Sequence, residues 1–266
     1  MASRIAARVF RPCSSVTEVP PCPLHARTRR PWPRSPRPGA PTRLRVGVLA
    51  EPWGGNHPSG AVAVAVAQTA ALCADLGHEA SVDLGVSWEE FVRHSSVLWS
   101  ANIATWVADT AASTGRAVDH STLEPQTLAV YRTGTALPAL DMVRALDTRN
   151  AVTRSVVASM ADLDLVLTPT LPDVAAPLGT NTNDIDGFDG HDWTARLFAH
   201  SPFTPWANTA GLPAASLPLF QDETTGMPIG IELAAASGRE DLVLALAGQL
   251  ERAAPWIHRR PAVWAG

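Results

Sequence analysis

Lysine is absent from the 266-residue sequence, and all 21 of its basic residues are arginines. A guanidinium group keeps its proton up to about pH 12, so arginine cannot act as a neutral base near pH 7. Chemistry that depends on a lysine side chain is therefore excluded for this polypeptide.

Cysteine is scarce as well, since the chain has only Cys13, Cys22 and Cys73. These three have neither the pairing nor the spacing of a disulfide or zinc framework, which favours a reducing, cytoplasmic compartment. No apolar run reaches the about 18 residues of a membrane span. A net charge of −4 gives no electrostatic reason to expect nucleic acid. We expect neither a membrane nor a nucleic acid as partner.

Motifs for nucleotides and for activated serines are also missing. The loop at residues 50–56 carries Gly54-Gly55 but has neither the Gly-x-Gly-x-x-Gly nor the P-loop spacing, which indicates a plain turn. The chain has no Gly-x-Ser-x-Gly elbow. Its Ser-Ser pairs, Ser14-Ser15 and Ser95-Ser96, have no glycine neighbours. We expect no cofactor.

The first 41 residues differ in composition from the rest. Positions 1–45 hold ten arginines and one acid, Glu18, and nine prolines lie between Pro12 and Pro41. Such a segment shows no helical or strand periodicity, so we interpret residues 1–41 as a disordered leader and residues 42–266 as the folded domain. The leader is interpreted as a transit peptide, a basic arm, or sequence that does not belong to the fold.

Regular periodicity begins at Leu44. The pattern predicts a buried strand at 44–49, an apolar helix at 61–76 with Ser59 as its N-cap, and a second strand at 78–84. Strand, helix and strand within about forty residues indicate a parallel βαβ unit.

Three helices are predicted next. They span residues 87–115, 122–134 and 138–160. Ser87 and Glu90 have the spacing of a capping box, and Pro125 stands in a first turn, where proline is tolerated. His94 and His120 lie in this region without a second histidine at i+4, so we predict no metal site there.

A buried strand at 164–168 runs into a loop broken by prolines, with Thr168 and Thr170 at its end. Ligands gather at the carboxyl ends of strands in α/β sheets, so these two hydroxyl groups are candidates for a pocket wall. A plain strand followed by a turn is the alternative interpretation.

Residues 177–200 are predicted to form a polar loop that contains four aspartates and one internal histidine, His191. An EF-hand register would put Thr182 at its first position and Trp193 at its twelfth, so the pattern does not fit calcium. We predict a solvated loop on the substrate side and no metal site.

The last 66 residues contain the most informative pattern. Apolar residues alternate before and after a turn at 224–226, which predicts two strands joined as a hairpin. A short helix is predicted before them. A terminal helix follows them, with Ser237 and Glu240 spaced as a capping box.

This stretch resembles the C-terminal end of the amidase signature family. The matching motifs are Asn208-x-x-Gly-x-Pro-Ala, Leu-Pro218, Gly226-x-Pro-Ile-Gly-Ile, Gly238-Arg-Glu-Asp and Glu251-x-x-x-Pro-Trp. Residues 164–170 are similar to the family's Asp-x-x-x-x-Pro-Thr strand. Residues 98–102 and 123–125 resemble the subgroup of aminohexanoate cyclic dimer hydrolases. The resemblance implies the C-terminal part of an α/β/α fold, with a mixed sheet flanked by helices.

The resemblance also implies a reaction and a pocket. Amidases of this family hydrolyse carboxamides with a Ser–cis-Ser–Lys triad, and the substrate is a small-molecule amide. The substrate-pocket residues that we predict are Thr168, Thr170, Phe203, Trp206 and Asn208. The family's Gly/Ser-rich nucleophile segment and its lysine have no counterpart in this sequence. We therefore predict no catalytic residue in the chain, and expect the chain to be inactive alone.

Two alternatives stay open from the sequence. The chain is interpreted as a non-catalytic binding or partner module that complements a separately encoded N-terminal half, or that forms a homodimer through an exposed sheet edge. The other alternative is a metal-dependent hydrolase that uses the Asp/His loop.

Overall fold

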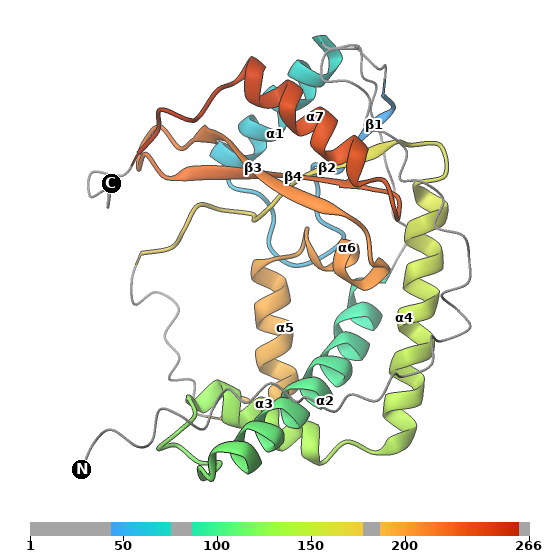
Figure 1. Cartoon of the computed structure of the whole chain (residues 1–266), viewed down its shortest axis with the longest axis vertical. Coiled ribbons are helices and arrows are strands. Elements are labelled where there is room, and N and C mark those ends of the chain that lie inside the picture. Colours follow the sequence, from blue (N-terminus) through green and yellow to red (C-terminus); the bar gives the residue numbers. More distant parts are fainter. Residues whose placement is uncertain (1–43, 76–86, 178–186, 261–266) are drawn as a thin grey trace, which may run out of the picture. The chain divides into compact units, whose positions relative to one another are not determined.

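A four-stranded mixed sheet, in the order β1–β2–β4–β3, forms the centre of the described part of the chain (Figure 1). This computed structural model describes residues 44–75, 87–177 and 187–260. The strands are β1 (Val46–Val48), β2 (Leu165–Pro169), β3 (Ala214–Gln221) and β4 (Pro228–Ala235). The predicted leader, the predicted strand at 78–84 and loop residues 178–186 lie outside the described residues.

The strand pairing is both parallel and antiparallel. β1 runs parallel to β2, whereas β4 is antiparallel to β2 and to β3. β3 and β4 form the predicted hairpin, whose turn is held by Asp222, because its carboxylate accepts a hydrogen bond from Thr225 N at 2.8 Å. The register pairs Leu167 with Leu233 and Leu217 with Ile231, so the alternating apolar residues meet on one face. The predicted mixed sheet is confirmed.

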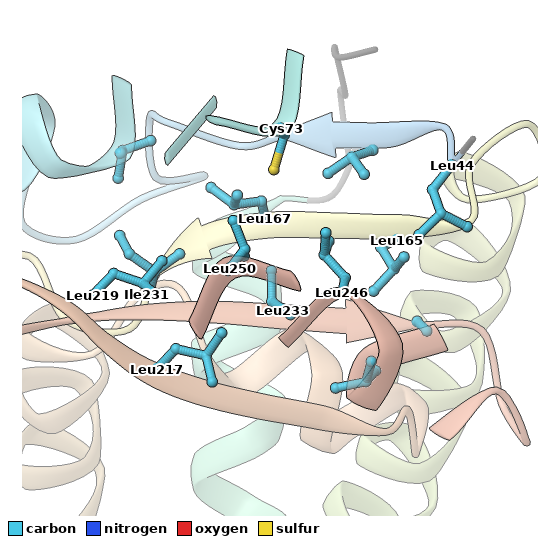
Figure 2. Packing of buried hydrophobic residues seen from close by; sticks show 14 of the residues in the cluster. Leu44, Cys73, Leu165, Leu167, Leu217, Leu219, Ile231, Leu233, Leu246 and Leu250 are labelled. Carbon is cyan, nitrogen blue, oxygen red and sulfur yellow. The ribbon is translucent and has the colours of Figure 1, made fainter. Parts of the chain in front are cut away.

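Helices cover both faces of this sheet. Their bounds are α1 (Gly60–Asp75), α2 (Trp88–Thr114), α3 (Pro125–Thr135), α4 (Ala139–Ser159), α5 (Gly190–His200), α6 (Pro205–Ala210) and α7 (Glu240–Ala253). On one face, apolar residues of α1 and α7 pack against the sheet, as Figure 2 shows for Cys73, Leu246 and Leu250 around Leu167 and Leu233. On the other face, residues of α2, α4, α5 and α6 form a second buried cluster. The predicted α/β/α arrangement is confirmed.

The two buried clusters have different compositions. Leucine, isoleucine and valine dominate the cluster beneath α1 and α7. The opposite cluster contains aromatic side chains, and its Phe91 ring lies 4.6 Å from Trp53 and 5.6 Å from Phe198 between centroids. Such spacings are typical of favourable aromatic pairs. The aromatic cluster anchors α2 and α5 beneath the sheet.

The free edge of β3 is protected by two features. Pro218 within β3 lacks a backbone donor, and the Arg259 guanidinium donates hydrogen bonds to Pro218 O at 3.0 Å and Leu219 O at 2.9 Å. Both features reduce the ability of an edge strand to pair with another chain.

Two helix starts lack the side-chain cap bonds that the sequence predicts. Ser59 accepts the first helical bond through its carbonyl from Ala63 N, but its hydroxyl is buried without a hydrogen-bond partner among the described residues. At α7, Gly238 has φ of 79°, so the cap moves to Arg239, which makes no side-chain cap bond. Ser59 thus stands at the N-cap of α1 as predicted, although its hydroxyl makes no cap bond, whereas the predicted capping box at Ser237 and Glu240 is wrong. At α2 the Ser87 hydroxyl accepts a hydrogen bond from Glu90 N at 3.4 Å, as predicted.

The predicted polar loop at 177–200 is wrong over its second half, because α5 begins at Gly190. Asp189 caps this helix by accepting hydrogen bonds from His191 N and Asp192 N at 2.8 and 2.9 Å. Phe198 and Thr194 are buried on its inner face. The capping aspartate belongs to the same Asp/Gly-rich run that led to the loop prediction.

Candidate functional site

Polar side chains gather where β2 ends beside β4. Thr168 is fully buried, and its hydroxyl lies 2.9 Å from Pro169 O and 3.2 Å from the Oε2 atom of Glu232. A hydroxyl group has one proton to donate. When that proton goes to Pro169 O, the contact with Glu232 requires a proton on the carboxyl group itself.

Glu232 is the buried acid of this cluster. It lies on β4 directly opposite Thr168 of β2 and Ser216 of β3, and it is 6% exposed. Burial raises the pKa of its carboxyl group to about 7, although the hydrogen bond from Thr168 acts in the opposite direction. The Glu232 carboxyl group therefore takes up or releases a proton near neutral pH.

The next pair along these strands is more accessible. The Thr170 hydroxyl lies 2.6 Å from the Ser216 hydroxyl, and Thr170 N donates to Gly230 O at 2.9 Å. A Cβ atom at Gly230 would stand 2.7 Å from Thr170 Oγ1 and 2.9 Å from Ser216 Oγ. Glycine at position 230 is thus required for this close approach of β4 to the two hydroxyl groups.

The remaining predicted pocket residues lie in the short helix α6 or just before it. Pro205 stands in its first turn, and Gly211 ends it with φ of 66°. Phe203 and Trp206 are fully buried. Trp206 belongs to the same cluster as Ala234, and alternation along β4 puts Ala234 on the face of the sheet that carries Glu232.

Asn208 is exposed and lines a cavity of about 760 Å³. The five predicted residues thus do not gather at one place, since Thr168 and Thr170 lie at the end of β2, Trp206 packs in the cluster beneath the sheet, and Asn208 lines this cavity. Their contact with a substrate stays a prediction.

Helices α2, α5 and α6 form most of that cavity. Its wall contains aromatic and aliphatic side chains together with hydroxyl and amide groups, among them Phe91, Leu98, Trp99, Asn102, Trp106, Phe198, Ser201 and Thr204. The Trp99 and Phe198 rings lie 5.3 Å apart between centroids, and the Trp106 side chain is 68% exposed. Arg149 of α4 completes the wall.

These cavity residues were not predicted from the sequence. Trp99 and Trp106 are seven residues apart, which puts them on one face of α2 and offers a signal for the cavity. Phe198 lies in the segment that was predicted as a loop, so it was not predicted to line a cavity. Arg149 has no local signal, because only tertiary packing brings α4 to α6.

A serine–histidine contact lies nearby, but it is not an activated nucleophile. Ser96 Oγ contacts the Nδ1 atom of His191 and donates its own proton to Arg93 O at 2.8 Å. Ser96 is 2% exposed. Its hydroxyl is therefore engaged by the backbone of α2 and is closed to a substrate.

Within 44–75, 87–177 and 187–260, no three His, Cys, Asp or Glu side chains gather closely enough to hold a metal ion. Among the helices of those ranges, none combines the length and the apolar character that crossing a membrane requires.

Comparison with known proteins identifies the family. A family profile described as Amidase matches residues 16–244. The chain belongs to the amidase family. It is 34% identical to AmiC of Mycobacterium tuberculosis over 189 residues, which are 70% of this chain and 38% of AmiC.

The chain is also similar to a second relative and to a solved structure. The 6-aminohexanoate-cyclic-dimer hydrolase of Paenarthrobacter ureafaciens is 29% identical over 229 residues, covering 83% of this chain and 46% of that protein. The solved structure of 6-aminohexanoate cyclic dimer hydrolase superimposes with a TM-score of 0.75 at 29% identity, over 88% of this chain and 50% of that one. The chain thus spans less than half the length of these two curated amidase-family relatives.

Proposed function

We propose that this chain is the substrate-pocket half of an amidase-type hydrolase, which converts a carboxamide into a carboxylate and an amine or ammonia. Family membership supports the reaction class. The single observation that carries the proposal is the cavity bounded by Asn208, because it offers a small molecule both apolar walls and polar groups that orient it.

In this proposal the polypeptide binds the substrate, and a separate catalytic part supplies the serine and its general base. In the family's reaction, a serine attacks the amide carbonyl, the amine leaves, and water hydrolyses the acyl-enzyme. The serine needs a general base, which in this family is a lysine, and the sequence contains none. We therefore propose that the 266-residue polypeptide binds substrate but does not turn it over by itself.

An assay with and without a catalytic half tests this proposal. The purified polypeptide is incubated with a panel of aliphatic, aromatic and cyclic amides, and release of amine or ammonia is measured. The same assay is repeated after co-expression with the N-terminal half of the Paenarthrobacter ureafaciens hydrolase, and with that half alone as control. Turnover is expected only from the co-expressed pair. Enzyme-like turnover by the 266-residue polypeptide alone would overturn the inactivity claim.

A non-catalytic partner module is the second candidate function. It is favoured by the partial coverage of the relatives, since the chain matches 38% of AmiC and 46% of the cyclic dimer hydrolase. Under this proposal a partner or a second copy packs against this half. Co-expression with the catalytic half then raises the yield of dispersed protein, whereas a monomer that unfolds cooperatively by itself contradicts it.

Two further parts of the proposal concern the whole chain. We propose that residues 42–266 form the amidase-type domain, that residues 1–41 are a separate leader, and that the protein acts in the cytoplasm. Limited proteolysis followed by mass spectrometry tests the boundary. A first cleavage well inside 42–266 contradicts it.

A further inference from the structure

The cavity has one charged residue in its wall. Among the described residues that line it, Arg149 alone carries a charge, and neither aspartate nor glutamate is present. Within the described ranges the Arg149 side chain makes no ion pair or hydrogen bond, and the Thr153 hydroxyl donates to the Arg149 backbone carbonyl. An arginine guanidinium with free donors therefore borders a largely apolar cavity.

A second arginine of α4 is different. Arg144, about one and a half turns earlier, pairs with Asp141 at 3.6 Å. Arg149 has no such partner. Its planar donor fork matches a carboxylate, which it binds through two parallel hydrogen bonds.

The opposite walls define the rest of the ligand. Trp99, Trp106 and Phe198 offer ring faces for an aryl group or an alkyl chain, and Asn102 and Asn208 supply amide donors and acceptors. A volume of about 760 Å³ lies within the range of pockets that hold small organic molecules. Charge complementarity thus points to an anion that carries an apolar body.

We propose that this cavity binds a small carboxylate with an aryl or alkyl body, whose carboxylate pairs with Arg149 and whose body lies against Trp99 and Phe198. Binding of this carboxylate does not depend on the proposed function. Its identification as the acid or amine part of the amide substrate rests on the proposed function. The substrate class is then an amide with a free carboxylate at some distance from the scissile bond.

Direct binding measurements test the proposal without any turnover. The purified chain is titrated calorimetrically with 4-phenylbutyrate and with 4-phenylbutyramide, which have the same body and differ in charge. The carboxylate is expected to bind about three- to fivefold more tightly than the amide, the size typical of a partly exposed ion pair.

Three variants separate the contribution of the ligand's charge to the affinity from that of its apolar body. Arg149→Gln is expected to reduce the affinity for the carboxylate to that for the amide and to leave the amide unchanged. Arg154→Gln removes an arginine about one and a half turns later on α4 that does not line the cavity, and both affinities are expected to stay the same. Trp99→Leu is expected to weaken both ligands equally. Thermal unfolding of each variant verifies that it is folded.

Each other outcome counts against the proposal. Equal affinities of the unmodified chain for the two ligands, an unchanged carboxylate affinity in Arg149→Gln, or no saturable carboxylate binding at millimolar concentration would overturn it. These results are independent of the amidase assay. Failure of turnover after co-expression leaves the binding result standing, and loss of carboxylate preference leaves the amidase proposal standing.

Discussion

Glu232→Gln is the substitution whose effect on stability is best defined by the structure. The glutamine side chain has nearly the same shape as the glutamate, keeps an acceptor for the Thr168 hydroxyl and carries no charge at any pH. The substitution therefore removes the titration of Glu232 and leaves its packing on β4 nearly unchanged.

The sign and size of the effect follow from the pKa. Burial raises the pKa of Glu232 from 4.5 to about 7, so the folded state holds this proton more tightly than the unfolded state. Below pH 4.5 both states are protonated, and the stability contribution is fully present. Between pH 4.5 and 7 the unfolded state ionises first, so the free energy of unfolding falls, by about 3 kcal/mol once the pH exceeds 7.

Urea unfolding followed by tryptophan fluorescence measures this difference. Wild type and Glu232→Gln are compared at pH 5 and at pH 8, so that the titration of all other groups cancels. The free energy of unfolding of wild type relative to the variant is expected to fall by about 2 to 3 kcal/mol between these two pH values. Glu223→Gln, in the exposed β3–β4 turn, serves as control. Parallel pH dependences of wild type and Glu232→Gln would refute a raised pKa.

Two further predictions concern packing and the sheet edge. Gly134→Ala should destabilise the chain by about 1 to 3 kcal/mol in urea unfolding, because its Cβ would lie 2.0 Å from Ser100 O of α2. Gly248→Ala, with no atom closer than 3.5 Å, should instead stabilise α7 by about 0.5 to 1 kcal/mol, and equal effects at the two sites would contradict the packing. Arg259→Ala should uncover the carbonyl groups of β3 and increase association in light scattering, whereas Arg252→Ala should not.

Local sequence patterns predicted those helices and strands that are specified by residues close together in the sequence. The alternation of Leu217 and Leu219, and of Ile229 and Ile231, specifies two half-buried strands, and the structure buries all four on the same face. The glycine at position 115 ends α2 in the left-handed conformation, as its place after an apolar periodic run predicts. Each of these predictions depends on residues that are neighbours in the sequence.

Other features depend on contacts between distant residues, which the sequence does not display. The spacing of Ser237 and Glu240 is right for a capping box, but Gly238 turns the chain and Arg239 bonds to Asp241 instead. The carboxyl end of β2 was recognisable from its prolines and threonines. Glu232 contacts Thr168 at this end of β2, although the two residues are 64 positions apart in the sequence. The apolar alternation of β4 predicted only the opposite face of that strand.

The residues that show the family here mostly support backbone approach and packing. Gly230 allows β4 to lie against Thr170 and Ser216, and Gly211 ends α6 so that the chain turns into β3. None of these positions performs a proton transfer or a nucleophilic attack. Similarity over this half therefore shows the fold and does not by itself identify a catalytic residue. Under the proposed function, the cavity beside Arg149 is a place where substrate preference is set, because its charge comes from an exposed side chain of α4, whereas Val152 and Val156 of the same helix are buried against the sheet.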